Sequence, residues 1–249
     1  MTKLIGIIPA AGKAMRLPFL PFSKELYPIK TSQDLDPNPS GETLHPIIDL
    51  MVNRMKIADA NKFLIIISKE KVDILKHLAS GEKYACQFSY LIQENQSGLP
   101  DALSLANDWL EEDSLVIFGM PDTFFEPKDA FKRIVEDHIQ TKADVTLGLF
   151  PTEKPEKYGM VGFDRKGNFL TTVDKPTQTT LRYLWGIACW NKCFSNFMTT
   201  YLKENNGKHE IVLSSVFMAA HTKGIRIRVV PFEAGKYTDI GTLDDLLAV

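Results

Sequence analysis

The sequence predicts an α/β fold in which a mainly parallel sheet is flanked by helices. Its 249 residues carry short apolar runs that alternate with stretches of helical periodicity. The runs at residues 4–8, 63–67 and 115–118 are unbroken, as is typical of strands that are buried on both faces. Strands that alternate with helices favour a parallel sheet, because a crossover helix returns the chain to the end where the previous strand began.

The remaining elements follow from the same patterns. Residues 47–58 predict a helix, because Ile48, Met51, Val52 and Met55 recur at helical spacing. Residues 225–230 alternate apolar and polar side chains and predict a half-exposed strand. Further strands are expected at 87–92 and 145–150, and further helices at 72–78, 99–110 and 129–138.

The alternation of strands and helices ends at about residue 150, and shorter strand patterns follow. Residues 158–173 predict two short strands around a turn at 164–168, followed by a strand at 182–190 and a helix at 194–202. No linker composition separates this β-rich lobe from the rest. We therefore expect a single domain over 1–249, with a core of about 1–150 and a lobe of about 151–205. The clearest loop is 31–43, which is polar and contains two prolines.

Composition excludes several classes of protein. The formal net charge is −2, so a basic footprint for nucleic acid or membrane lipid is not expected. No run approaches the roughly 20 apolar residues of a membrane span. The three cysteines are expected to be buried free thiols in a reducing compartment, which indicates the cytoplasm. His77 and His138 fall in surface positions of their predicted helices, and a homo-oligomer stays open.

The stretch after the first predicted strand suggests an anion site. Ala10, Ala11 and Gly12 have almost no side chain, so a ligand could approach their backbone amides. The carboxyl ends of parallel strands are where ligands bind in open α/β sheets. The spacing matches neither the phosphate-binding loop nor the dinucleotide motif. A tight turn with solvated charges is the equally weighted alternative. The cations of the stretch are Lys13, Arg16 and Lys24.

Two aspartates elsewhere in the sequence are candidate metal ligands. Asp122 lies just beyond a buried strand, where a carboxylate could hold a cation that bridges phosphates. Asp239 lies in a turn within "YTDIGT". Taken singly, each aspartate is more often a helix cap or a turn residue.

Two further segments could contact a ligand. In "QENQSGLPDAL", the Gln93 amide could contact the edge of a nucleobase and Gly98 could let a base lie on the backbone, although an ordinary loop is the simpler interpretation. In "VDKP", Lys175 and Asp174 lie at a strand end, where a plain surface ion pair is the usual alternative.

Taken in order, these segments resemble the sugar-1-phosphate nucleotidyltransferases that make nucleotide sugars. "PAAGKAMRLPFLPFSKELYPI" is similar to their N-terminal glycine-rich motif, and its "KELYP" ending resembles that of UTP–glucose-1-phosphate uridylyltransferases and glucose-1-phosphate thymidylyltransferases. "QENQSGLPDAL", "GMPDT", "YGMVGFD", "VDKP", "LWGIACWN" and "YTDIGTLDDL" are similar to the other motifs of the family. The resemblance covers nearly the whole chain.

The resemblance implies a Rossmann-like, GT-A-like core with a small sugar-binding lobe. It also implies that a sugar 1-phosphate attacks the α-phosphorus of an NTP, UTP or dTTP being favoured, and releases pyrophosphate. Such chemistry needs positioning and charge neutralisation more than a strong base. The roles it implies are these: Arg16 on the leaving pyrophosphate, Lys24 on the α-phosphate, Asp122 and Asp239 on Mg²⁺, Gln93 and Gly98 on the base, Gly159 and Asp174 on the sugar, and Lys175 on the sugar phosphate.

Departures from the family pattern keep two alternatives open. Ala14 and Met15 stand where the family has glycine and threonine, so a non-catalytic nucleotide-binding homologue is one alternative. Ser23 stands where the family has a proline. Asp174 in "VDKP" replaces a glutamate, so transfer to a non-sugar phosphate such as phosphocholine is the other alternative. The chain ends soon after its last motif, and acetyltransferase activity is not expected.

Overall fold

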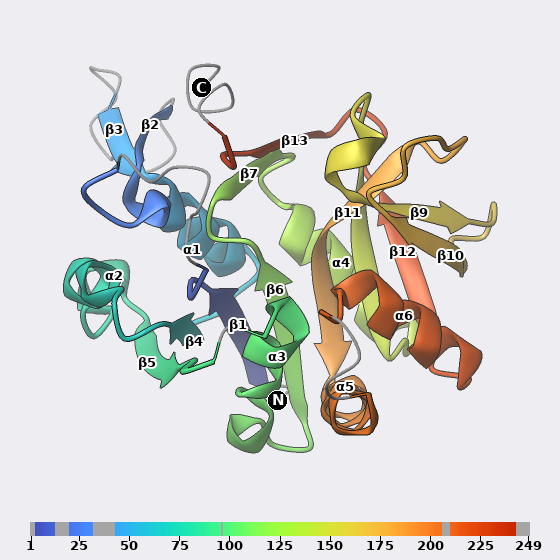
Figure 1. Ribbon diagram of the computed structural model, residues 1–249, viewed down its shortest axis with the longest axis horizontal. Coiled ribbons are helices and arrows are strands. Elements are labelled where there is room, and N and C mark those ends of the chain that lie inside the picture. Colours follow the sequence, from blue (N-terminus) through green and yellow to red (C-terminus); the bar gives the residue numbers. More distant parts are fainter. Residues whose placement is uncertain (1–2, 13–19, 32–42, 96, 206–209, 243–249) are drawn as a thin grey trace.

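The computed structural model describes residues 3–12, 20–31, 43–95, 97–205 and 210–242, and it confirms the α/β fold (Figure 1). A nine-stranded mixed sheet forms its centre, in the order β10-β9-β11-β6-β1-β4-β5, with β8 and β12 joined beyond β11. The predicted loop falls mostly outside the described residues, which resume at residue 43.

The first half of the chain builds the parallel part of the sheet. The strand β1 lies between β4 and β6, and β5 pairs with the outer edge of β4, all in parallel. Because β1, β4 and β6 are covered on both faces, their side chains are almost uniformly buried, whereas β5 at the edge is largely exposed. The four strands are β1 (Lys3–Pro9), β4 (Lys62–Ile67), β5 (Gln87–Ile92) and β6 (Ser114–Gly119).

The second half extends the sheet with antiparallel strands. The long strand β11 (Tyr183–Asn191) pairs with β6 and β9 along one edge and with β8 along the other. β12 adds to β8 in parallel, and β9 and β10 form the hairpin that the sequence predicts. The other strands are β8 (Val145–Pro151), β9 (Gly159–Phe163), β10 (Phe169–Asp174) and β12 (Ile227–Pro231).

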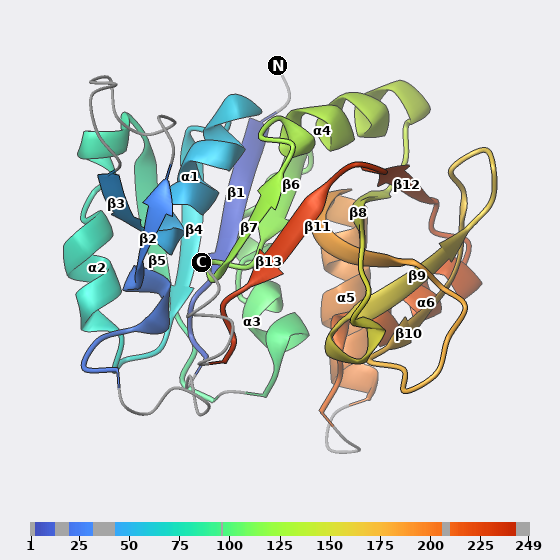
Figure 2. The same cartoon turned by 90° about the horizontal axis from the view of Figure 1, so that it is seen from above.

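Helices cover both faces of the sheet, as the two views show (Figures 1 and 2). On one face, apolar side chains of α1 (Ile47–Ile57), α2 (Val72–Leu78) and α4 (Ala130–Thr141) form one core. On the other face, α3, α5 and α6 form a second core, which contains the buried Trp190 and Phe194. These helices span Leu99–Ser104, Lys192–Glu204 and Leu213–Thr222.

Two small sheets and four short 3₁₀ helices complete the described fold. β7 (Thr123–Glu126) pairs antiparallel with β13 (Lys236–Asp239), and β2 (Pro28–Thr31) with β3 (Thr43–Pro46). The predicted helix 99–110 is divided into α3 and a 3₁₀ helix, η3 (Asn107–Trp109). The others are η1 (Lys24–Leu26), η2 (Glu82–Tyr84) and η4 (Pro155–Lys157). None of the helices in the described ranges is both long and apolar enough to cross a membrane.

Two expectations about single side chains are wrong. His138 is only 3% exposed, because it lies on the face of α4 that packs on the sheet, where its Nδ1 lies 3.1 Å from Thr146 Oγ1. Cys193, in the first turn of α5, is exposed, whereas Cys86 and Cys189 are buried as expected. All three thiols are free.

Candidate active site

The pairing of β7 with β13 brings Asp122 and Asp239 together. Asp122 follows β6 and immediately precedes β7, and Asp239 at the end of β13 lies opposite Thr123. The N–H of Ile240 donates to the carbonyl oxygen of Asp122 at 3.0 Å, which continues the pairing by one more bond. Two segments far apart in the sequence therefore place their carboxylates at one end of a short ribbon.

The Asp122 carboxylate has capacity for a further ligand. Its side chain is only 5% exposed, and its Oδ2 accepts a charge-assisted hydrogen bond from Lys24 Nζ. Its Oδ1 is buried and has no hydrogen-bond partner among the described residues. A buried carboxylate oxygen without a partner is costly, so its presence fits a cation that would complete the site.

The carboxylates also fit what Mg²⁺ requires. This ion keeps several waters and is commonly held by one or two carboxylates together with the phosphates of a substrate. Within the described part of the chain, no group of three or more histidine, cysteine or acidic side chains could hold a metal ion. The pair of Asp122 and Asp239 thus suits a cation that arrives with a nucleotide better than a closed all-protein metal site.

Lys24 is held as a cation beside these carboxylates. It begins η1, and its side chain is 18% exposed. Burial by itself would lower the pKa of its ammonium group, but the carboxylates of Asp122, Glu25 and Asp239 outweigh burial and keep that pKa above its usual value. Lys24 is therefore charged at neutral pH and placed to meet an anion.

A buried ion pair supports the 3₁₀ helix that carries Lys24. Both carboxylate oxygens of Glu25 accept hydrogen bonds from Lys71 Nζ, at 2.6 and 2.7 Å, and the side chains are 2% and 9% exposed. Just before them, Ser23 donates its N–H and its hydroxyl to the Asp73 carboxylate, each at 2.7 Å. A proline at position 23 would lack that N–H, so this departure from the family pattern has a structural counterpart in Asp73.

Gln93 and Gly98 line a cavity together with Lys24 and Asp122. Gln93 follows β5 and is 5% exposed, and its Nε2 donates to Asp101 Oδ2 at 2.8 Å. Gly98 has a φ of 108°, which disfavours other residues, and a Cβ there would lie 3.3 Å from Ile211 O. The backbone of Gly98 therefore lies against the segment at residues 210–211 because it has no side chain.

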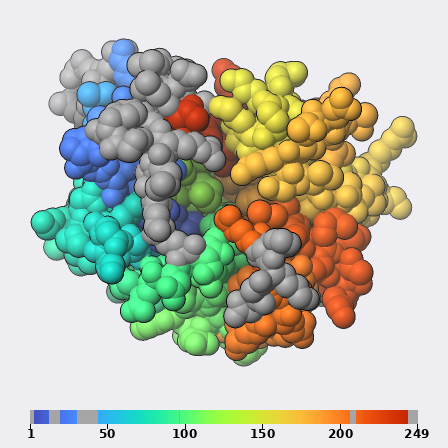
Figure 3. Space-filling model, viewed as in Figure 1, coloured from blue at the N-terminus to red at the C-terminus, as the bar shows by residue number. Residues whose placement is uncertain are grey.

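One cavity of about 290 Å³ lies at the carboxyl ends of β1, β5 and β6, and its lining includes Lys24, Asp122 and Gln93 but not Asp239. This is the edge at which ligands bind in open α/β sheets. In the space-filling view, the blue-to-green half of the chain and the yellow-to-red half form opposite sides of the molecule (Figure 3). The lining comprises Pro9, Ala11, Gly12, Lys24, Glu25, Gln93, Gly98, Leu99, Ala102, Met120, Pro121, Asp122 and Glu210.

The small residues after β1 differ in what they can offer a ligand. Ala11 and Gly12 line the cavity, and a Cβ at Gly12 would meet no described atom within 4 Å. Ala10 is fully buried and donates its N–H to Ile66 O at 2.6 Å, so its amide belongs to the sheet. Arg16, with Lys13, Ala14 and Met15, lies outside the described residues.

The residues predicted to bind the sugar form a separate group. Asp174 and Gly159 are direct partners in the β9–β10 pairing, and the Lys175 N–H donates to Tyr158 O at 2.9 Å. Lys175 has a φ of 45°, an uncommon conformation for a residue with a side chain. None of the three lines the cavity described above. The ring of Tyr158 contacts that of Tyr237 on β13, with centroids 5.9 Å apart, and so connects this group to the strand that ends in Asp239.

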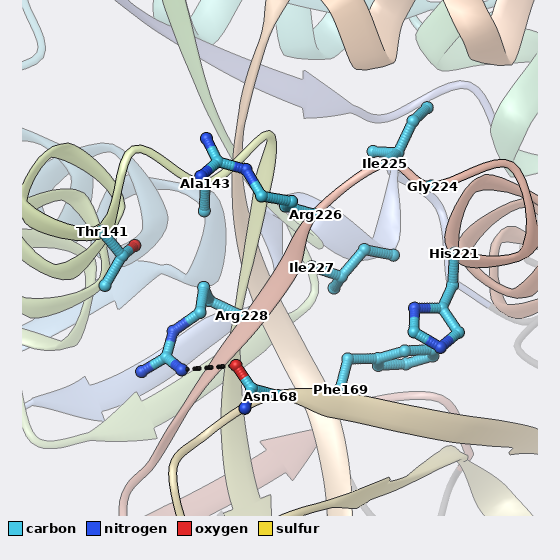
Figure 4. Close-up of a pocket in the computed structure, with 10 residues that line it drawn as sticks. All are labelled: Thr141, Ala143, Asn168, Phe169, His221, Gly224, Ile225, Arg226, Ile227 and Arg228. Atoms are coloured by element: carbon cyan, nitrogen blue, oxygen red, sulfur yellow. Dashed lines mark hydrogen bonds between the residues drawn. The ribbon is translucent and has the colours of Figure 1, made fainter.

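A larger cavity, of about 600 Å³, lies elsewhere (Figure 4). It opens beside β12, and His221 packs edge-on against Phe169 on one side of it. On another side, Arg228 Nη1 donates to Asn168 Oδ1 at 2.9 Å. Its lining contains no carboxylate and none of the residues that the sequence singles out. The smaller cavity is therefore the candidate active site.

Three supporting residues of the site escape sequence reasoning. Asp101 lies within "QENQSGLPDAL" but is given no role there, and Lys71 and Glu210 lie in no motif. Each reaches the cavity or its supports through the fold. The signal that could have found Asp101 is its spacing from Gln93, since both belong to the loop and helix start that follow β5.

Comparison with known proteins gives a consistent result. A sequence model described as "Nucleotidyl transferase" matches residues 5–249. The chain is 26% identical over 230 residues to the bifunctional protein GlmU of Clostridioides difficile, covering 89% of this chain and 45% of that protein. It is 21% identical over 247 residues to a glucose-1-phosphate thymidylyltransferase of Mycolicibacterium smegmatis, covering 97% of this chain and 79% of that protein.

A solved structure shares the fold. It is described as a putative glucose-1-phosphate thymidylyltransferase from Bacillus anthracis in complex with a sucrose, and it matches with a TM-score of 0.81 at 23% identity. The match covers 98% of this chain and 93% of that one. The chain spans less than half the length of the first curated relatives that it matches.

Proposed function

Because the chain belongs to the nucleotidyl transferase family, we propose that it is a Mg²⁺-dependent enzyme that transfers a nucleoside monophosphate to a sugar 1-phosphate. UTP or dTTP is the proposed donor, and pyrophosphate is the second product. The observation that carries the proposal is the convergence of Lys24, Asp122 and Asp239 at a cavity that Gln93 also lines.

The proposed reaction is a substitution at phosphorus. An anionic oxygen of the sugar phosphate forms a bond to the α-phosphorus, and the bond from that phosphorus to the bridging oxygen breaks. Pyrophosphate leaves with the electron pair. The attacking oxygen is already deprotonated at neutral pH, so no general base is required, and stabilisation of the charge on the phosphates dominates.

Each residue of the site has a proposed role in this reaction. Asp122 and Asp239 would hold Mg²⁺. Asp122 Oδ1 could bind the ion directly, because it has no hydrogen-bond partner among the described residues. When bound, the ion neutralises charge on the phosphates and helps to orient them. The Lys24 ammonium would contact the α-phosphate once it is drawn away from Asp122, and Gly12 leaves room for phosphates to approach the backbone.

The sugar phosphate is assigned to the hairpin of β9 and β10. Asp174 and Gly159 face each other in the pairing, which supports a shared role toward the sugar. Lys175 would contact the sugar's phosphate, and its uncommon backbone conformation is of the kind that clusters at functional sites. Arg16 keeps the role on pyrophosphate that the resemblance implies. A cytoplasmic location is part of the proposal, supported by the free thiols of Cys86 and Cys189 inside the core.

A pyrophosphate-release screen tests the proposal. UTP, dTTP, CTP, GTP and ATP are each offered with a panel of sugar 1-phosphates and with phosphocholine, with Mg²⁺ or with EDTA. We expect release with a uridine or thymidine nucleotide, abolished by EDTA and by Asp122→Ala or Asp239→Ala. Binding of nucleotide without release under any combination would instead identify a non-catalytic homologue.

A further inference from the structure

We propose that Asp101 fixes the orientation of the Gln93 amide, so that the site selects uracil and thymine over cytosine. The inference rests on the proposed function, because it takes the cavity beside Gln93 to be the base site. It assigns Asp101 a positioning role, since Asp101 acts on the nucleotide through Gln93.

Gln93 is held through both its backbone and its side chain. Its backbone N–H donates to Ile67 O at 2.9 Å, which anchors the residue to the end of β4. Its Nε2 donates to Asp101 Oδ2 at 2.8 Å and lies 3.4 Å from Gly98 O. The side chain is buried and lines the cavity, so its amide is placed where a ligand would meet it.

The chemistry of its neighbours decides which end of the amide faces them. A carboxylate and a backbone carbonyl only accept hydrogen bonds, so both require the NH₂ group of Gln93. Rotating the amide by 180° would set its oxygen against two acceptors and would lose a hydrogen bond to a charged group. Such a bond shifts an equilibrium by about tenfold or more. The carbonyl oxygen is thus the atom that Gln93 offers to a ligand.

An acceptor at this position distinguishes the pyrimidines. Uracil and thymine carry an N3–H donor between two carbonyl groups, whereas N3 of cytosine is an acceptor. A fixed amide oxygen therefore gains a hydrogen bond from uracil or thymine and faces a lone pair in cytosine. Sites that are built to hydrogen-bond one group reject analogues that leave their buried polar atoms unpaired.

Asp101 is held well enough to impose this orientation. It lies in the first turn of α3, where its backbone oxygen accepts a hydrogen bond from Ser104 Oγ at 2.7 Å. Its side chain is directed to Gln93, whose Nε2 donates to its Oδ2. An asparagine at this position could accept from the Gln93 NH₂ group or donate to the Gln93 oxygen, so it would stabilise both orientations.

The test compares UTP with CTP, which differ at this edge of the base. Dissociation constants for both nucleotides are measured with Mg²⁺ for the wild-type chain, Asp101→Asn and Asp101→Ala, and kcat is measured where turnover occurs. We expect wild type to prefer UTP, and the ratio of the CTP to the UTP dissociation constant to fall by about tenfold or more in both variants. For UTP, the change in kcat should be much smaller than the change in this ratio.

Two controls sharpen the result. Glu94→Gln removes the same charge from an exposed residue next to Gln93 and should keep the wild-type ratio. 3-Methyl-UTP, which lacks the N3–H, should bind wild type as poorly as CTP does. Thermal melting of each variant confirms that it is folded.

The outcomes separate the two proposals. If wild type binds UTP and releases pyrophosphate but both Asp101 variants keep its preference, this inference is wrong and the proposed function stands. A wild-type chain that binds CTP as tightly as UTP also overturns only the inference. If wild type binds no nucleotide, both proposals fail.

Discussion

Replacing Lys71 by methionine should destabilise the protein far more than loss of a surface lysine would. In the wild-type chain, both carboxylate oxygens of Glu25 accept hydrogen bonds from Lys71. The substitution removes these bonds and leaves Glu25 buried without a cation. Breaking a buried pair from one side typically lowers the free energy of unfolding by about 3–5 kcal/mol, whereas an exposed pair contributes about 0–1 kcal/mol. With side chains only 2% and 9% exposed, this pair belongs to the first class.

Urea unfolding followed by tryptophan fluorescence measures the loss. We expect Lys71→Met to lower the free energy of unfolding by about 3–5 kcal/mol at pH 7. The double variant Glu25→Gln/Lys71→Met should lower it clearly less, because no buried charge is left unpaired. The single variant should also lose pyrophosphate release, since η1 carries Lys24.

The pH dependence gives an independent check. Burial raises the pKa of the Glu25 carboxyl, and Lys71 opposes that rise. Without Lys71 the folded-state pKa should rise further above the unfolded value. Such a group favours folding below the unfolded pKa of about 4.5, and this contribution is lost as pH rises through the folded pKa. The deficit of Lys71→Met should therefore shrink toward pH 4.5. A loss of stability below about 1 kcal/mol that does not change with pH would show that Glu25 and Lys71 behave as an exposed pair.

Three further predictions follow from single contacts. Burial lowers the pKa of His138 to about 4, from 6.5 for a free side chain. The free energy of unfolding should therefore fall by about 3 kcal/mol as pH falls from 6.5 to 4, because the unfolded chain binds the proton more readily. In denaturant titrations, His138→Gln should remove this part of the pH dependence, and an unchanged pH dependence would contradict the prediction. Gly159→Ala should destabilise the β9–β10 hairpin, because its Cβ would lie 2.3 Å from Trp185 Nε1; thermal melting checks it, and a variant that melts like wild type but loses only sugar phosphate binding would show that substrate contact alone requires the glycine. Ser23→Pro should cost about 1–3 kcal/mol, because Asp73 loses its N–H and hydroxyl donors; a neutral effect in urea unfolding would argue against that contact.

The buried strands could be predicted from the sequence because burial on both faces leaves a direct mark. β1, β4 and β6 appear as unbroken apolar runs, and the helices α1 and α2 between them show regular apolar spacing. The strands β7 and β13 could not be predicted in this way. Each is only four residues long, and they are separated by more than 100 residues of sequence, so no local pattern indicates their contact.

The same limit applies to the site. Position at the end of a strand made Asp122 a candidate, but only the β7–β13 ribbon explains why Asp239 lies beside it. α6 also escaped prediction, because apolar Met218 and Ala219 lie among its less buried residues, so the helix lacks a clear polar stripe. Asp101 and Lys71 escaped because one aspartate or lysine at a helix start is usually a solvated side chain, and burial against Gln93 or Glu25 arises only in the fold.

The proposed metal and nucleotide sites can be located in a crystal structure with Mn²⁺ in place of Mg²⁺ and a UTP analogue that cannot be cleaved at the α-phosphorus. We expect anomalous density for the metal at the carboxylates of Asp122 and Asp239, the Lys24 ammonium on the α-phosphate, and the uracil N3–H within hydrogen-bond distance of the Gln93 oxygen. Metal density away from both aspartates, or a nucleotide bound in the larger cavity beside β12, would contradict these expectations.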